Sequence, residues 1–290
     1  MTQQEQKLKR EQKKQQKAEE VAEEQEAGEL SAPTGKVIYR TILTEGEKEL
    51  MRPTAALFWS GIAAGLSMGF SMIMEGLLNT YLPDAPWRPL VANFGYSAGF
   101  LVVILGRQQL FTENTLTPIL PLLQHPTLNT FRNVLRLWGV VLVANLLGAL
   151  ALALVIANTP AFDSPVQAAF AELGHHAMSH DFGTTMLRGI FAGWLIALMV
   201  WLLPFAESAR VWVIIFITYL VGLGGFSHII AGSVETFTLA AMGQASWLAV
   251  FGGFVLPTLL GNILGGVTLV AVLNHAQIVA GKDEDIPPAL

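Results

Sequence analysis

The sequence contains no cysteine, and most of its charged residues lie in the first fifth, so charge is sparse in the rest of the chain. Without cysteine, disulfides, thiolate zinc sites, iron–sulfur clusters and cysteine nucleophiles are excluded. Only seven of the 17 lysine and arginine residues lie beyond residue 53. The basic residues from Lys7 to Lys17 are followed by glutamates from Glu19 to Glu26, which offset them. The sequence therefore indicates no nucleic-acid-binding surface.

Apolar residues dominate the rest of the chain. Of 290 residues, 52% are hydrophobic and 13% are charged, and the mean hydropathy is +0.50, which is typical of a protein that lies in a bilayer. Because a charged stretch precedes the first apolar run, we expect no signal peptide and a first span that is retained. A span needs about 20 apolar residues. That requirement predicts an all-α membrane protein with six spans, near 54–78, 89–123, 135–158, 184–204, 210–242 and 248–273.

The charged ends flank this region. Residues 1–44 are expected to form a cytoplasmic tail, because a sequence of Gln, Lys and Glu cannot bury a core. Residues 45–278 form the predicted transmembrane transporter domain, and residues 279–290 form a short cytoplasmic tail. Residues 36–43 are a mixed apolar patch, and residues 45–52 are expected to lie on the membrane surface as an amphipathic lead-in.

The second and fifth predicted spans are too long to be simple helices. The second runs into polar residues at 107–115, and the fifth runs into residues 224–233, which are rich in glycine. Each is expected to be a half-helix, a loop and a second half-helix. With spans one to three paired against spans four to six, the halves form an inverted repeat, although no residue-by-residue repeat is visible.

Broken helices at membrane depth indicate a solute pathway. Non-helical backbone survives there only where protein covers it or where a cavity admits water. The half-helices that follow the breaks point their amino-terminal dipoles toward them, and such ends favour an anion.

Two sequence patterns predict orientation and packing. If the amino terminus is inside, 15 of the 17 lysines and arginines face inward and only Arg88 and Arg188 face outward, so both termini are predicted to be cytoplasmic. Small residues at a spacing of four let helix backbones approach closely. They occur in the first, second and sixth spans, at Gly61, Gly65, Gly69, Gly95, Gly99, Gly261 and Gly265.

The breaks contain four residues that need an explanation. His228 is either a proton donor or anion-attracting group on the pathway, since imidazole changes charge near neutral pH, or a neutral brace of the loop. Thr112 either lies on the pathway or caps the half-helix after it. Arg107 and Glu113 either pair with each other or face the cytoplasm.

Other polar residues carry weaker hypotheses. Glu75, near the end of span one, is interpreted as interfacial. The outer loop holds His175, His176 and His180, which are more typical of a solvated cluster than of a metal site. No metal or cofactor is expected. The spans contain no evident paired carboxylates, nucleophile–base pair or metal set, so an enzyme is not indicated.

Several motifs resemble those of the formate/nitrite transporter family, and more closely those of a divergent branch found in bacterial inner membranes. Leu110–Thr112 lies in the first break and Gly225–His228 in the second. Gly261–Gly266 lies in span six, and a longer match runs from Glu45–Leu50 through Gly61–Gly69. The resemblance covers residues 45 to 278.

The resemblance implies an aquaporin-like fold, a homopentamer with one pore in each protomer, and a bacterial inner-membrane location. It implies passage of small monovalent anions, such as formate, nitrite or hydrosulfide, as transiently protonated acids. By position, the pore histidine is His228 and the loop threonine is Thr112. The constriction residues are Tyr96, Phe100, Leu110, Phe111, Val200 and Val221, with Asn262 of span six on the pathway.

This sequence also departs from the formate channels. Val221 stands where they commonly carry an aromatic residue, and Ala197 stands where they carry an asparagine. Their outer basic residue falls near Asp181, with His180 as a possible substitute. A neutral-solute or water pore therefore stays an alternative. A membrane scaffold that acts through the charged amino-terminal tail is a further one.

Overall fold

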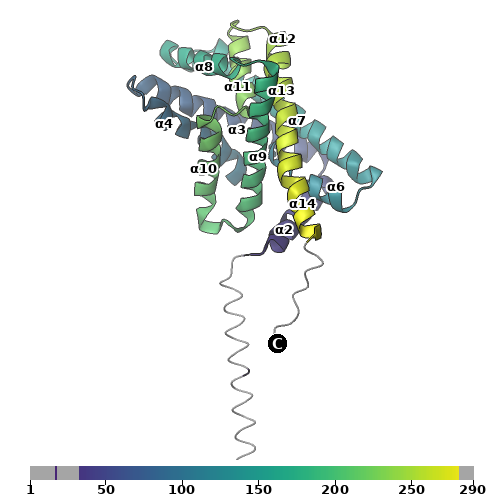
Figure 1. The fold of residues 1–290 in the computed structure, drawn as a ribbon. Coiled ribbons are helices and arrows are strands. Elements are labelled where there is room, and N and C mark those ends of the chain that lie inside the picture. The colour runs from purple at the N-terminus through teal and green to yellow at the C-terminus, as the bar shows by residue number, and fades with distance from the viewer. Residues whose placement is uncertain (1–16, 18–32, 281–290) are drawn as a thin grey trace, which may run out of the picture. The chain divides into compact units, whose positions relative to one another are not determined.

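The computed structural model describes residue 17 and residues 33–280, and every regular element in this part of the chain is a helix (Figure 1). Before the first break come α2 (Gly35–Met51), α3 (Thr54–Tyr81), α4 (Arg88–Ala92), the 3₁₀ turn η1 (Asn93–Tyr96) and α5 (Ser97–Leu105). After it come η2 (Glu113–Thr115), α6 (Ile119–Gln124), α7 (Leu128–Asn158) and α8 (Ser164–Ala177). Next come α9 (Phe182–Leu202), the 3₁₀ turns η3 (Leu203–Phe205) and η4 (Glu207–Ala209), α10 (Arg210–Leu223) and α11 (Ile229–Ala241). The last stretch is continuous and comprises α12 (Trp247–Val250), the π-helical η5 (Phe251–Val255), α13 (Leu256–Gly266), the π-helical η6 (Val267–Val272) and α14 (Leu273–Ala280).

The predicted six spans are confirmed. Five helical stretches of the described chain are long and apolar enough to cross a membrane: Thr54–Tyr81, Arg88–Leu105, Leu128–Asn158, Phe182–Phe205 and Trp247–Ala280. α10 and α11 are shorter, and in series they make a further crossing that is interrupted at residues 224–228. Large apolar side chains such as Trp212, Phe216 and Leu248 are exposed on these helices, as expected of surfaces that meet lipid.

The two interrupted helices confirm the predicted pair of broken spans, with one difference in extent. We call residues 106–112 the first break and residues 224–228 the second break. The second break is shorter than the predicted 224–233, because α11 begins at Ile229 directly after His228.

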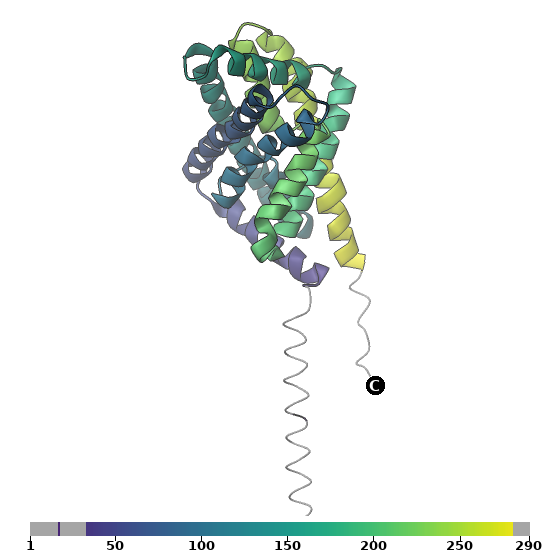
Figure 2. The same ribbon diagram turned by 90° about the vertical axis from the view of Figure 1, so that its left-hand side faces the viewer.

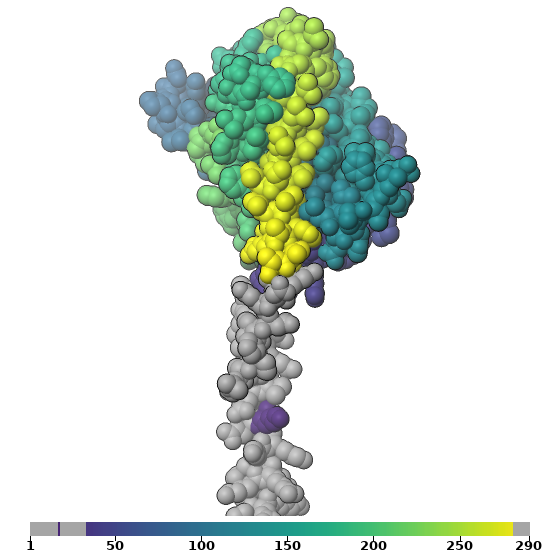
Figure 3. All heavy atoms as spheres, turned by 45° about the vertical axis from the view of Figure 1, so that its right-hand side comes forward, coloured from purple at the N-terminus to yellow at the C-terminus, as the bar shows by residue number. Residues whose placement is uncertain are grey.

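α2 and α14 lie at the same end of the protein (Figure 2). The hydroxyl of Tyr39 on α2 is 2.7 Å from Nδ1 of His275 on α14. In the space-filling view, the carboxyl-terminal helical stretch forms a yellow column at the surface, between green and teal helices (Figure 3). Most of the predicted tails, 1–44 and 279–290, lies outside the described residues, so these domain boundaries stay predictions.

Glycines bring α3 against α7 and α9 against α13 in the same manner. A Cβ atom at Gly65 would collide with the backbone carbonyl of Asn145, and one at Gly193 would collide with that of Asn262. The predicted small-residue packing therefore applies in both halves of the molecule. It also gives the inverted repeat a residue-by-residue basis that the sequence did not reveal.

One helix was missed by the sequence analysis. The predicted outer loop at 159–183 contains α8, which buries Val166, Phe170 and Gly174. These residues recur at helical spacing, a signal that was present in the sequence. The Phe170 ring packs on Gly76 of α3, where a Cβ would collide with it.

Candidate functional site

The two breaks begin with the same turn. α5 and α10 each end with a residue in the left-handed backbone conformation, Arg107 at φ 50° and Gly225 at φ 60°. The residue after each donates its N–H to a carbonyl five residues earlier, from Gln108 to Val103 at 2.9 Å and from Phe226 to Val221 at 3.0 Å. This 6→1 bond is typical of a helix that ends in a Schellman turn.

Asn145 of α7 holds the first break. Its Oδ1 accepts the Phe111 N–H at 2.9 Å, and its Nδ2 donates to the carbonyls of Gln109 and Gly61, both at 2.8 Å. Non-helical backbone in a bilayer needs such partners because water is absent. Asn145 therefore provides hydrogen-bond partners for the backbone of the first break and links this break to α3.

Asn262 of α13 holds the second break with the same three bonds. Its Oδ1 accepts the Ile229 N–H at 2.9 Å, and its Nδ2 donates to Ser227 O at 2.9 Å and Gly189 O at 2.8 Å. Asn262, which the resemblance placed on the pathway, is fully buried and both groups of its amide are occupied. We refer to these two asparagines with their bonds as the clamps.

His228 joins the second break to the first. It precedes α11, and its Nδ1 accepts the N–H groups of Ile230 at 3.3 Å and Ala231 at 3.2 Å. Its Nε2 lies 2.8 Å from Thr112 Oγ1. Since Nδ1 is an acceptor, this network assigns the single proton of a neutral imidazole to Nε2. Nε2–H then donates to Thr112, whose hydroxyl proton is left to donate onward.

Two pockets flank this hydrogen bond. The first pocket has about 70 Å³ of space for solvent, enough for a few water molecules, and its walls include Tyr96, Val221 and His228. The second pocket, of about 900 Å³, includes Val200 among its walls.

An apolar layer separates the pockets. Tyr96, the last residue of η1, lines the first pocket, and Ile104 of α5 lines the second. Phe100 lies between them, and its ring centroid is 4.9 Å from that of His228. Five of the predicted pathway residues line neither pocket and are at most 1% exposed: Phe100, Leu110, Phe111, Thr112 and Asn262.

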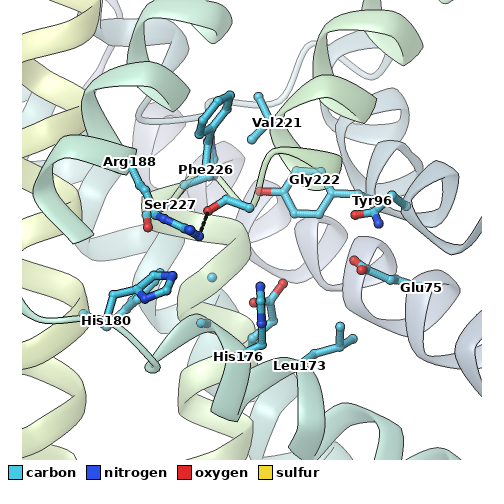
Figure 4. Close-up of a pocket in the computed structure, with 17 residues that line it drawn as sticks. Glu75, Tyr96, Leu173, His176, His180, Arg188, Val221, Gly222, Phe226 and Ser227 are labelled. Carbon is cyan, nitrogen blue, oxygen red and sulfur yellow. Dashed lines mark hydrogen bonds between the residues drawn. The ribbon is translucent and has the colours of Figure 1, made fainter. Parts of the chain in front are cut away.

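The first pocket also holds polar residues that the sequence analysis missed or placed elsewhere (Figure 4). Glu75, which the sequence analysis interpreted as interfacial, is only 8% exposed and lines this pocket. Glu235 on α11 was missed, although it follows His228 by two helical turns and so shares its face. Arg188 donates to Gly225 O at 3.0 Å and thereby steadies the second break.

The outer histidines are divided between this pocket and the surface. His176 and His180 line the first pocket, whereas His175 contacts Gln244 at 3.0 Å. Burial, with help from the charge of Arg188, lowers the pKa of His176. Asp181 caps α9 by accepting the N–H groups of Gly183 and Thr184. In the described chain, no group of three or more His, Asp or Glu residues is arranged to hold a metal ion.

The second pocket is lined by charges of both signs. Its walls include Arg107 and Glu113, whose pairing the sequence left open. Among the residues that the structure describes, the ion pairs are Arg52–Glu49 and Arg88–Asp84, so Arg107 and Glu113 face the pocket without pairing. Residues of α2 form one wall, which gives this lead-in helix a place beside the pathway.

Together, the fold and the site define a polytopic α-helical membrane protein whose two interrupted helices meet at a histidine–threonine hydrogen bond between two pockets. The family model described as formate/nitrite transporter matches residues 36–276, and the chain belongs to this family. The family predicted from the two break motifs is therefore confirmed.

Similar proteins agree with this assignment. The inner membrane protein YfdC of Escherichia coli K12 is 44% identical over 241 residues, which cover 83% of this chain and 78% of that protein. The formate-nitrite transporter of Plasmodium knowlesi is 25% identical over 261 residues, which cover 83% of this chain and 82% of that protein.

Two solved structures have the same fold. One is a pentameric formate channel with formate bound, at a TM-score of 0.66 and 21% identity, covering 78% of this chain and 98% of that chain. The other is an ion channel of the same family, at a TM-score of 0.70 and 20% identity, covering 83% of this chain and 98% of that chain. The predicted aquaporin-like fold is confirmed.

Proposed function

We propose that this protein is a channel or transporter for small monovalent anions of the formate and nitrite type. The solute passes between the two pockets beside the His228–Thr112 hydrogen bond, and passage is proton-assisted. The observation that carries the proposal is this bond, because it joins the two breaks within the layer that separates the pockets. Membership of the formate/nitrite transporter family supports it.

The apolar layer explains why protons matter. A bare anion that passes Phe100, Phe111 and Val200 loses most of its hydration, and the cost of an isolated charge in an apolar medium is very large. Protonation converts the anion into a neutral acid and removes most of that cost. A neutral acid still needs hydrogen-bond partners, which Thr112 and the Nε2–H of His228 supply.

His228 serves in this proposal as a neutral donor. A second proton on Nδ1 would break its bonds to Ile230 and Ala231, and it would put a cation at the positive end of the α11 dipole. The two hypotheses from the sequence therefore combine. The imidazole braces the loop through one nitrogen and assists the solute through the other.

The remaining parts of the proposal concern assembly and orientation. We propose a homopentamer, by analogy with the pentameric formate channel that shares the fold, in a bacterial inner membrane, as for YfdC. Both termini face the cytoplasm, so the second pocket opens inward and the first opens outward. Arg107 and Glu113 then contribute to the inner entrance. Transport, rather than catalysis, is the function.

Flux measurements on the full-length protein in proteoliposomes test the proposal. The panel contains formate, nitrite, acetate, lactate and hydrosulfide, with water and glycerol as neutral solutes. We expect saturable or channel-like uptake of at least one weak acid and faster uptake at acidic pH. Passage of only the neutral solutes would support the water-pore alternative. Absence of all flux from an intact oligomer would contradict the proposal and favour a scaffold.

A further inference from the structure

The first pocket contains two buried carboxylates without partners. Glu75 of α3 is 8% exposed and Glu235 of α11 is 9% exposed, and both line the pocket. Within the described chain, neither side chain makes a hydrogen bond or an ion pair. Both carboxyl groups line the same small pocket, which has about 70 Å³ of space for solvent. The fold therefore brings two carboxyl groups together at this depth.

A third buried polar group points into the same space. Tyr96 is 6% exposed, and its hydroxyl is directed into the pocket opposite His176 and His180 (Figure 4). This hydroxyl also lacks a hydrogen-bond partner within the described chain. The oxygens of Glu75, Glu235 and Tyr96 are not among the described side-chain atoms that are fully buried without a partner, so they are open to the pocket that these residues line. Three such groups around one small cavity indicate that the cavity takes a polar, hydrogen-bonding occupant.

The other charged groups of the pocket do not neutralise the carboxylates. Arg188 directs its Nη1 to the carbonyl of Gly225 at 3.0 Å. His176 carries little charge at neutral pH, because burial and Arg188 lower its pKa. His228 is held neutral by its bonds to the α11 backbone. Two neighbouring carboxylates that share one site cannot both ionise cheaply, so the pair is most stable when it keeps at least one proton.

We propose that Glu75 and Glu235 form a proton-loading site for weak-acid anions. This inference rests on the proposed transport function. The O–H bond of a protonated Glu75 or Glu235 breaks, and the proton forms an O–H or S–H bond with the anion in the pocket. The neutral acid moves on past Phe100 and Thr112. The carboxylate left behind takes a proton from the water of the pocket.

This site selects by acid strength. An anion of a weak acid, such as a short carboxylate, nitrite or hydrosulfide, accepts the proton. An anion of a strong acid, such as nitrate or thiocyanate, stays charged and is repelled by the carboxylates. The pocket therefore admits solutes according to their proton affinity, in addition to their size.

Glutamine substitutions separate this role from a structural one. Glu75→Gln and Glu235→Gln keep the size and remove the titratable proton. In proteoliposomes, the double variant is expected to take up formate on the order of 100-fold more slowly, the lower end of what a positioned proton donor contributes. Its uptake should lose most of its dependence on pH, and a thiocyanate current should become measurable. Glu172→Gln, an exposed change on α8, is the matched control and should behave as wild type.

Two further measurements keep the inference falsifiable. The double aspartate variant retains two carboxyls and should recover part of the pH dependence. Infrared spectroscopy at neutral pH should show a protonated carboxyl band in the wild-type protein that the double glutamine variant lacks. An assembled double variant with wild-type flux, pH profile and carboxyl band would overturn the proton-loading site. A wild-type protein that shows the band but carries no weak acid would overturn the proposed function instead.

Discussion

Leu110 in the first break and His228 in the second break occupy equivalent places in the two halves of the molecule. Each is the middle one of three consecutive residues that one asparagine holds. In both breaks, the asparagine side chain accepts the N–H of the third residue and donates to the carbonyl of the first. Each comes after a turn whose left-handed residue lies three positions earlier. The backbones of the breaks are therefore alike, and their side chains are not.

The difference between Leu110 and His228 changes the helix that comes after each break. The imidazole Nδ1 accepts two N–H groups of the next turn, and α11 runs on from Ile229 to Ala241. Leucine has no acceptor, and the first break is followed only by the short η2. Pro118, which lacks an N–H and restricts the residue before it, then delays α6. The helix cap supplied by His228 and the proline at position 118 thus both contribute to the difference between the segments that follow the two breaks.

The comparison also shows how a symmetric backbone acquires an asymmetric chemistry. The clamps form hydrogen bonds with equivalent backbone groups in both breaks. The groups that remain for the solute are the polar end of His228 and its partner Thr112, with Leu110 and Phe111 as apolar walls. The site is polar on one side because only one of the two equivalent positions carries an imidazole.

The largest effect is expected from removing a clamp. Asn145→Ala and Asn262→Ala each leave a break N–H and a break carbonyl buried without partners. At roughly 1–3 kcal/mol for each orphaned group, each variant should lose roughly 2–6 kcal/mol of stability. Thermal unfolding in detergent, followed by size-exclusion chromatography, measures this loss. Asn158→Ala, at an exposed position whose amide bonds within its own helix, is the control. A large loss in only one of the clamp variants would show that the clamps are not equivalent.

The second test distinguishes the roles of the two ring nitrogens of His228. In His228→Asn, the amide oxygen can still cap α11, since asparagine is a preferred cap, but the shorter side chain no longer reaches Thr112. We expect an intact oligomer whose weak-acid flux falls by up to about tenfold, the equivalent of one hydrogen bond. Proteoliposome uptake from about pH 5 to pH 8, a range that spans the imidazole pKa, measures it.

Thr112→Val is the companion to this variant. It removes the hydroxyl and leaves the cap on α11 intact, so it should lower flux to a similar extent, with a loss of stability of no more than about 1–3 kcal/mol from the Nε2–H of His228 that loses its partner. His228→Leu, which resembles the residue of the first break, should in addition lose about 1 kcal/mol through the missing cap. If His228→Asn assembled normally and kept wild-type flux over the whole pH range, His228 would be only a brace.

The spans and breaks were predictable because hydropathy records them directly. A bilayer imposes a fixed length on every crossing, so a run that is too long and polar in its middle indicates a break. The inverted repeat was predicted from the positions of the two breaks, but its residue-by-residue basis was not, because the shared groups are backbone N–H and carbonyl groups and the equivalent side chains differ. Asn145 and Asn262 stand out only when their partners are known.

The residues of the first pocket were harder to predict for another reason. The two breaks by themselves identify His228 and Thr112, but the pocket is completed by Glu75 of α3, Glu235 of α11, His176 of α8 and His180, which follows α8. These residues are far apart in sequence and meet only through tertiary packing. The position of Glu235, two turns after His228 on the same helix, was the one signal that the sequence offered.

The smallest effect concerns the left-handed residue before each break. Arg107, at φ 50°, and Gly225, at φ 60°, share this conformation, which costs a residue with a Cβ about 1–2 kcal/mol. Gly225→Ala should therefore lose about 1 kcal/mol, and Arg107→Gly should gain a few tenths, because the greater freedom of unfolded glycine offsets most of the relief. A Cβ atom at Gly225 would also lie 2.8 Å from Nη1 of Arg188. Gly243, at φ 75°, has open space around it, so Gly243→Ala measures the cost of the backbone conformation without such a contact. Unfolding midpoints of the three variants measure the series. If Arg107→Gly lost as much stability as Gly225→Ala, the arginine side chain would contribute to the first break, and the turns would be alike in shape only.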